Sequence, residues 1–153
     1  MTVLALIRPD SWNWALLVHV TGAAILVGGL VAAGGASVLA RRDATGTLSA
    51  FSYRMLLVVG LPGLILMRAG AAWVYDKEGW TGDSDPTWLG IGFLTADIGA
   101  VLFIIALILG GIGLRRTRRG DGGSGLLRAS GIIALVLLAA YVITVWAMAG
   151  KPG

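Results

Sequence analysis

The stretch WNWALLVHVTGAAILVGGLVAAGGASVLARR, which runs from Trp12 to Arg42, decides the fold class of this chain. It contains no Asp, Glu, Lys or Arg before its final pair of arginines, and it exceeds the roughly 20 residues with which an α-helix crosses the hydrocarbon core of a bilayer. A secretory signal peptide has a shorter apolar region and is not closed by a basic pair. We therefore predict a transmembrane helix over residues 12–40.

Three further apolar stretches of membrane-spanning length follow, at residues 55–75, 87–114 and 126–150. The composition agrees, because 57% of the 153 residues are hydrophobic and only 13% are charged, against roughly 25% charged residues in soluble domains. The length corresponds to one domain. We therefore predict a single membrane domain over residues 1–153, all-α, built as a four-helix transmembrane bundle with up-down topology.

The loops predict how this bundle is oriented. The connections after the first and third spans are rich in arginine, and such loops stay in the cytoplasm. The connection between the second and third spans holds four carboxylates and one lysine, which places it outside together with both termini. Aromatic residues at this outer boundary resemble an interfacial belt, namely Trp12, Trp14, Trp73, Tyr75, Trp80, Trp88 and Trp146. With arginine in excess over lysine, the sequence predicts an N-out/C-out, multi-pass protein of a bacterial inner (plasma) membrane.

Polar side chains inside the spans are the best pointers to function, because ionisable groups in a bilayer are costly and usually face the protein interior. His19, Arg68 and Asp97 are ionisable, and Tyr141 and Thr144 add hydroxyl groups in the fourth span. With a rise of about 1.5 Å per residue, all five lie about 10–15 Å from the outer boundary. The sequence therefore predicts an intramembrane polar layer to which every helix contributes.

Within this layer we predict an ion pair between Arg68 and Asp97, with His19 and Tyr141 nearby, because pairing makes two charges tolerable in a low dielectric. Two alternatives stay open: Arg68 snorkels to the outer interface, or the pair only fixes the helix register. For His19 the alternatives are a hydrogen-bonded interior histidine and a ligand or proton-handling group.

Small residues predict where the helices touch. The face of the first span that carries His19 consists mostly of small side chains, namely Gly22, Ala23, Leu26, Gly29 and Ala33, and is expected to be a helix contact. Glycine pairs inside the spans have the same effect: Gly28 and Gly29, Gly34 and Gly35, Gly110 and Gly111. Pro62 lies between Gly60 and Gly63 and predicts a bend near the middle of the second span.

The residue types that are missing exclude several kinds of site. With no cysteine and one histidine, the chain alone forms neither a zinc site of nitrogen and sulfur ligands nor a bis-histidine haem, and no metal site is predicted. The acidic outer loop lacks the spacing of a calcium-binding loop. Nucleic-acid binding is rejected because topology explains the arginines. A histidine and methionine pair for haem stays open, with His19, Met67 and Met148 as candidate cofactor ligands.

Two motifs carry a resemblance to known families. The opening WNWALLVHVTGAAILVGGLVAAGGASVLARR and the ending YVITVWAMAGKPG resemble a bacterial family of predicted integral membrane proteins of uncharacterised function with four transmembrane helices. A more distant likeness, in the tryptophan, histidine and glycine pattern, reaches the CopD-type copper-resistance membrane proteins and the HemJ-type protoporphyrinogen oxidases. The HemJ-type likeness implies haem binding by His19. This chain departs from that family in having no other histidine and no lysine within a span.

Three functions follow as hypotheses. The first is a non-enzymatic accessory or partner-binding subunit, favoured by the short loops and by the absence of a recognisable catalytic set. The second is a haem- or copper-binding redox protein with His19 as ligand, in which a second copy could supply another histidine. The third is a small proton-coupled carrier that uses the titratable layer. The expected partners are membrane lipid and either further copies of the chain or another membrane protein.

Overall fold

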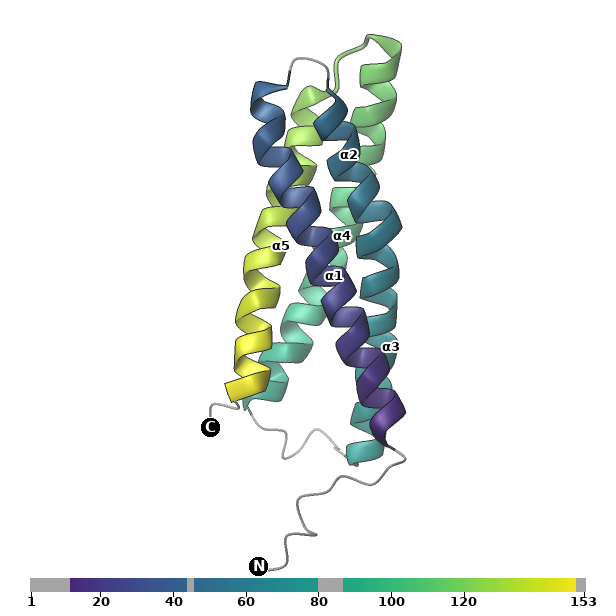
Figure 1. Cartoon of the computed structure of the whole chain (residues 1–153), viewed down its shortest axis with the longest axis vertical. Coiled ribbons are helices and arrows are strands. Elements are labelled where there is room, and N and C mark those ends of the chain that lie inside the picture. Colours follow the sequence, from purple (N-terminus) through teal and green to yellow (C-terminus); the bar gives the residue numbers. More distant parts are fainter. Residues whose placement is uncertain (1–11, 44–45, 80–86, 151–153) are drawn as a thin grey trace, which may run out of the picture.

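The computed structural model describes residues 12–43, 46–79 and 87–150. The regular elements of these residues are all helical. In chain order they are α1 (Asn13–Leu39), the 3₁₀ turn η3 (Ala40–Arg42), α2 (Thr47–Met55), the π-helical turn η4 (Leu56–Gly60), α3 (Leu61–Glu78), α4 (Thr87–Arg119) and α5 (Ser124–Gly150). Since α2, η4 and α3 follow one another without a break, they form one continuous rod (Figure 1).

Four helical stretches of the described residues are long and apolar enough to cross a membrane: Asn13–Arg42, Thr47–Glu78, Thr87–Arg119 and Ser124–Gly150. They lie side by side and alternate in direction (Figure 1). The predicted all-α four-helix bundle with up-down topology is therefore confirmed, and the chain has the architecture of a multi-pass membrane protein.

The second of these stretches begins at Thr47, eight residues before the start predicted at residue 55. The polar residues of α2 made this segment look like a loop, yet Ser52 is buried and its hydroxyl donates to the Ala33 carbonyl oxygen of α1 at 2.8 Å. A hydroxyl that bonds a backbone acceptor on the next helix leaves no unpaired group, so a polar turn can pack inside the bundle.

Near Pro62, where the sequence predicts a bend, the structure has the π-helical turn η4. Proline has no N–H for the carbonyl four residues earlier, and the helix widens directly before it. Gly60 ends this turn and lies against the ring of Phe103 in α4, since a Cβ at Gly60 would be 2.8 Å from Phe103 Cζ. Phe103 is the largest of the fully buried side chains, so the glycine at the end of the turn leaves space for a bulky core residue.

The helices pack as two antiparallel pairs, α1 with α3 and α4 with α5. In the first pair glycines allow the two backbones to touch, because a Cβ at Gly63 would collide with the backbone of Leu26. In the second pair the glycines occur on α4 and accept larger side chains of α5: Met148 lies on Gly92. Each pair is therefore held along its length by close contact at glycine.

The contact face predicted for the first span is confirmed. Four of its residues are buried in α1, namely Gly22, Leu26, Gly29 and Ala33, and Ala23 is half-buried. The two glycines of the pair Gly28 and Gly29 are not equivalent. Gly29 is buried against Gly60, whereas a Cβ added at Gly28 would have nothing within 4 Å. One glycine of this pair packs and the other faces outward.

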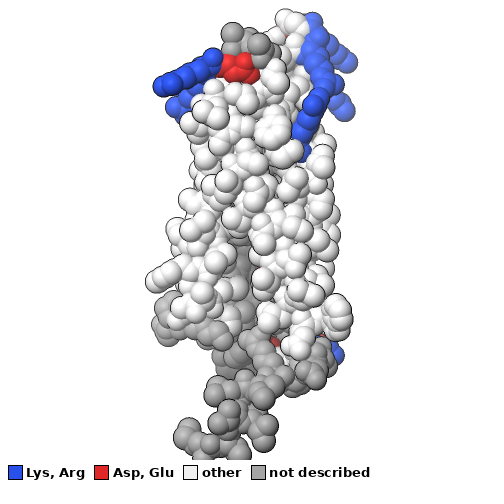
Figure 2. Space-filling view, in the orientation of Figure 1, with Lys and Arg blue, Asp and Glu red and all other residues white. Residues whose placement is uncertain are grey.

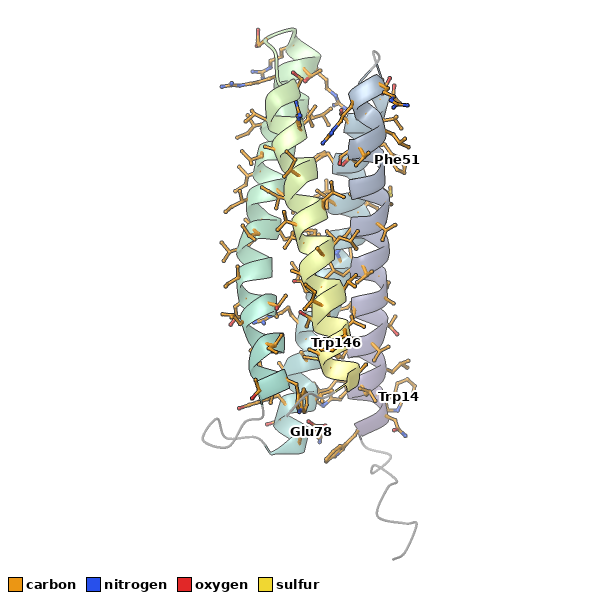
Figure 3. The ribbon with its side chains drawn as sticks, turned by 90° about the vertical axis from the view of Figure 1, so that its left-hand side faces the viewer. Trp14, Phe51, Glu78 and Trp146 are labelled. Atoms are coloured by element: carbon orange, nitrogen blue, oxygen red, sulfur yellow. The ribbon has the colours of Figure 1, made fainter. Side chains whose placement is uncertain are left out.

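The two ends of the bundle differ in charge. Figure 2 shows Lys and Arg side chains gathered at the end that holds the α1–α2 and α4–α5 connections, which we call the arginine-rich end. The opposite end, where α1 begins and α5 finishes, is the terminal end. Trp14 and Trp146 lie near it and are 68% and 66% exposed (Figure 3), as expected of aromatic side chains at a membrane interface. Trp80 of the predicted belt lies outside the described residues.

The two helix pairs are joined mainly in the half towards the arginine-rich end. There Gly34 of α1 accepts the side chain of Leu135, and Gly131 of α5 accepts Ser37. Towards the terminal end the pairs diverge (Figure 1), and α3 and α4 hardly touch. The terminal half of the bundle is therefore less filled than the arginine-rich half.

Candidate functional site

A cavity of about 380 Å³ lies between the helix pairs in the terminal half. Side chains of α1, α3, α4 and α5 line it, so all four membrane-length helices build it. Its volume falls within the roughly 300–1,000 Å³ of small-molecule sites, and most of its wall is apolar. The polar, aromatic and sulfur-bearing residues of the wall are His19, Met67, Arg68, Tyr75, Glu78, Trp88, Phe93, Tyr141, Thr144 and Met148.

His19, on α1, is held in place by a hydrogen bond to α3. Its Nδ1 lies 3.0 Å from the carbonyl oxygen of Met67. Because a carbonyl oxygen only accepts, Nδ1 carries the proton of this bond, and Nε2 of the neutral ring keeps its lone pair. The approach requires Gly70, where a Cβ would collide with the backbone of His19. His19 therefore offers a hydrogen-bond acceptor or metal-ligating nitrogen in a fixed ring orientation.

Tyr141, on α5, is 3% exposed, and its hydroxyl has no hydrogen-bond partner among the described residues. The hydroxyl oxygen lies against Gly99 of α4, where an added Cβ would be only 2.6 Å away. Leaving a buried hydroxyl unpaired costs about 1–3 kcal/mol. Tyr141 also lines the cavity, but its hydroxyl oxygen is enclosed at the contact with Gly99, which is not part of the cavity wall.

The remaining predicted residues of the wall have their own contacts. The Thr144 hydroxyl donates to the Ala140 carbonyl oxygen of its own helix at 2.9 Å, which satisfies its proton. Met67 is buried and holds His19 through its carbonyl oxygen. Met148 places its terminal methyl group on Gly92. Both candidate thioether ligands therefore line the same cavity as His19.

Arg68 and Asp97 form the ion pair that the sequence predicts, with Nη1 2.8 Å from Oδ1. The pair connects α3 with α4, and its side chains are 40% and 62% exposed, so it lies at the side of the bundle and not deep in its interior. Nearby on the same two helices, Tyr75 and Phe93 stack edge to face with ring centroids 5.1 Å apart. These two contacts bridge α3 and α4 beside the cavity.

The structure brings four residues of the predicted polar layer to one cavity. His19, Arg68, Tyr141 and Thr144 all line the cavity, whereas Asp97 joins it only through Arg68. No pattern in the sequence predicts how the His19 ring is oriented. Nor does one predict that the Tyr141 hydroxyl has no partner among the described residues.

Sequence reasoning missed the aromatic part of the wall. Tyr75 and Trp88 were assigned to the interfacial belt, and Phe93 was not singled out, yet all three line the cavity. Trp88, Gly92 and Ala96 are spaced four residues apart, so they share one face of α4. This spacing could have indicated that Trp88 faces other helices.

The described residues provide few side chains that could ligate a metal ion together. Among the described residues no group of three or more His, Cys, Asp or Glu side chains is placed to hold a metal ion. His19 Nε2 with a methionine thioether, from Met67 or Met148, is the set that fits a haem iron chemically.

Comparisons with protein-family models, with curated proteins and with solved structures found no match to this chain.

Proposed function

We propose that the chain is a non-enzymatic integral membrane protein that binds a small lipophilic ligand in the cavity between its two helix pairs. The observation that carries the proposal is a cavity of about 380 Å³ whose largely apolar wall holds the oriented ring of His19 and the guanidinium-bearing side chain of Arg68. An apolar wall favours a ligand that already partitions into the bilayer, and a few polar groups fix its orientation.

The side of the bundle between α3 and α4 supports access from the lipid. These helices hardly touch, and the side chains that bridge them are partly exposed, since Arg68 is 40% and Asp97 62% exposed. This side is therefore the proposed lateral route into the cavity for a molecule dissolved in the bilayer. Separating one ion pair and one pair of aromatic rings is a small rearrangement compared with separating helices that touch at glycine.

A matched pair of substitutions on α3 tests the cavity. Ala71 lines the cavity, whereas the next residue, Ala72, is exposed on the outside of the bundle. We expect Ala71→Phe to fill the cavity and Ala72→Phe to leave it open. Protein extracted with its native lipid is analysed by mass spectrometry for a retained small molecule. Wild type and Ala72→Phe should carry it and Ala71→Phe should not; equal content in the two variants, or none in wild type, would contradict cavity binding.

Haem is a second candidate for the ligand, favoured by the geometry of His19. A histidine that donates its Nδ1 proton to a backbone carbonyl presents Nε2 as metal-ligating histidines do, and Met67 and Met148 line the same cavity. The test is an optical spectrum of mildly solubilised protein, oxidised and dithionite-reduced. A Soret band that disappears in His19→Ala would establish haem; a featureless spectrum after expression with haem supplied would remove it.

Two other functions are weighed against ligand binding. A role as an accessory subunit, bound to further copies or to another membrane protein, is compatible with ligand binding. Purification as a lone monomer in mild detergent would count against this role. A proton-coupled carrier is less well supported, because Arg68 and Asp97 neutralise each other at the side of the bundle.

We also propose that the arginine-rich end lies in the cytoplasm of a bacterial cell and that the cavity faces the outer leaflet. Support comes from the gathering of arginines at one end (Figure 2). The chain has no cysteine, so a single introduced cysteine reports its own location. A membrane-impermeant maleimide should label Gly79→Cys in intact cells and Gly122→Cys only after lysis; the reverse pattern would invert the orientation.

A further inference from the structure

The arginine-rich end carries more positive charge than its own carboxylates can balance. Among the described residues its arginines are Arg41, Arg42, Arg54, Arg115, Arg116, Arg118, Arg119 and Arg128, and its acidic residues are Asp43 and Asp121. None of these arginines forms an ion pair within the part of the chain that the structure describes. Membrane topology accounts for arginines at this end, but it does not require them on any particular side of the bundle. Their placement around the bundle is therefore a separate observation.

Tyr53 joins α2 to α4 at this end. An added Cβ would be 2.5 Å from Tyr53 Cδ2 at Gly110 and 3.2 Å from the Tyr53 hydroxyl oxygen at Gly111, so the ring lies across both glycines of α4. Tyr53 is half-buried, and its hydroxyl is neither enclosed nor hydrogen-bonded among the described residues. The ring therefore fills the contact between the helices, while the hydroxyl stays available as a hydrogen-bond donor.

Exposed arginines from both helices accompany this hydroxyl. Arg54 follows Tyr53 directly on α2. Arg115 lies one turn, about 6 Å, beyond Gly111 on the same face of α4, and Arg118 continues that face. Since helical side chains lean towards the N-terminus of their helix, the Arg115 side chain leans over the turn of Gly111, where the Tyr53 hydroxyl lies. We call Tyr53, Arg54, Arg115 and Arg118 the α2–α4 edge; Figure 2 shows a column of Lys and Arg side chains along this side of the bundle.

Exposed aliphatic side chains continue from the α2–α4 edge towards the middle of the bundle. On α4 they are Val101, Ile104 and Ile108, which share the face of Arg115 and are between 53% and 59% exposed. On the adjoining rod Val58 is 64% exposed. A partner that meets both parts of this surface has an anionic head joined to a hydrocarbon chain. A water-soluble acidic protein would meet the arginines alone.

We propose that the α2–α4 edge binds the headgroup of an anionic phospholipid, with Arg54, Arg115 and the Tyr53 hydroxyl at the phosphate and an acyl chain along the exposed face of α4. Guanidinium groups hold phosphate oxygens by charge-assisted hydrogen bonds. A phosphate beside two arginines also offsets their mutual repulsion, whereas the ammonium of a zwitterionic lipid would add to it. The proposal is independent of the cavity, which lies in the other half of the bundle.

The test compares two lipids with identical acyl chains, phosphatidylglycerol and phosphatidylcholine. The full chain is placed in nanodiscs that hold equal amounts of both, and the lipids that stay bound are counted by native mass spectrometry. We expect phosphatidylglycerol to be enriched about fivefold or more among the bound lipids, which is the effect of one arginine near a charged headgroup. Equal retention of the two lipids would overturn the proposal.

Two matched double variants separate a defined site from the overall charge of this end. Arg54→Gln with Arg115→Gln removes two guanidinium groups from the α2–α4 edge, and Arg41→Gln with Arg42→Gln removes two from the α1–α2 connection. Both variants lower the net charge equally. We expect the first to abolish the enrichment and the second to keep it within about twofold of wild type. Equal losses would overturn the site, because binding would then follow net charge alone.

Three further measurements test the occupant and the place of binding. Tyr53→Phe keeps the ring on Gly110 and should lower the enrichment about two- to fivefold without lowering the melting temperature, since the hydroxyl has no partner to lose; an unchanged enrichment would contradict its contact with the phosphate. Excess inorganic phosphate should not displace the lipid, and displacement would assign the edge to a free anion. Ala71→Phe should leave the enrichment unchanged, and a loss would place the lipid in the cavity instead.

Discussion

The arginine-rich half and the terminal half of the bundle are built from the same four helices but are packed differently. In the arginine-rich half, hydroxyls bond carbonyl oxygens of neighbouring helices, as Ser52 does with Ala33 and Ser130 with Ala106, both at 2.8 Å. In the terminal half the corresponding hydroxyl of Tyr141 has no partner among the described residues. The arginine-rich half pairs these two hydroxyls between helices, whereas this one in the terminal half belongs to a residue that lines a cavity of about 380 Å³.

This difference shows which helix contacts stabilise the bundle and where space for a ligand remains. Within each helix pair, glycine contacts continue through both halves, as at Gly29 and Gly70 in the first pair. Between the pairs, the contacts at glycine include those of Gly34 with Leu135, Gly131 with Ser37 and Gly60 with Phe103. The cavity is therefore bounded by two closely packed helix pairs, which diverge towards the terminal end (Figure 1).

The largest effect is expected from breaking a helix pair. Gly63→Ala places a Cβ against the backbone of Leu26, where no side-chain rotation relieves the clash, and should lower the free energy of unfolding by at least about 2 kcal/mol. Gly28→Ala, in open space on α1, should be neutral or stabilising by up to about 1 kcal/mol. The two are compared by reversible unfolding in mixed micelles, and equal effects would show that glycine contact does not hold the pair.

An intermediate effect is expected at the bridge between α3 and α4. Asp97→Leu leaves Arg68 unpaired and should cost about 1–2 kcal/mol, less than the roughly 3–5 kcal/mol of a fully buried pair because both side chains are partly exposed. Adding Arg68→Leu should recover most of that loss, because no lone charge then remains. Double-mutant unfolding measurements check this, and strictly additive losses would mean that the pair does not couple the helices.

The smallest change in the free energy of unfolding is expected when a single hydroxyl hydrogen bond is removed, in either half of the bundle. Ser130→Ala removes a bond between α4 and α5 and should destabilise by about 0.6–1.5 kcal/mol. Thr144→Val removes a bond within α5 only, and should change stability by less than about 0.5 kcal/mol. Both variants are measured under one set of unfolding conditions. A Thr144→Val loss as large as that of Ser130→Ala would show that the cavity wall depends on this hydroxyl.

Much of the fold could be predicted because the bilayer imposes strong and local rules. Length and apolarity located four helices, and the small residues around His19 located the face of α1 that packs. The start of the second helix at Thr47 could not be predicted in this way. Its polar side chains look unsuited to a span until a carbonyl on another helix, that of Ala33, is present to accept from Ser52.

For the candidate site, depth could be predicted and geometry could not. Counting residues from the ends of the spans put His19, Arg68, Asp97 and Tyr141 at one level, and the Arg68–Asp97 ion pair formed as expected. The cavity itself was not expected, because it depends on how far the two helix pairs diverge. Whether these residues serve a ligand stays a prediction.

By itself, the sequence determined that the chain is helical, where its four apolar helices lie and which polar residues they carry to one depth, because these follow from residue type and from a fixed rise per residue. Only the tertiary structure decided that Nδ1 of His19 donates its proton to the Met67 carbonyl oxygen, that the Tyr141 hydroxyl has no partner among the described residues, and that a cavity lies between the two helix pairs. The physical reason is that hydrogen bonds and packing between helices depend on their relative rotation and separation, which no single helix specifies.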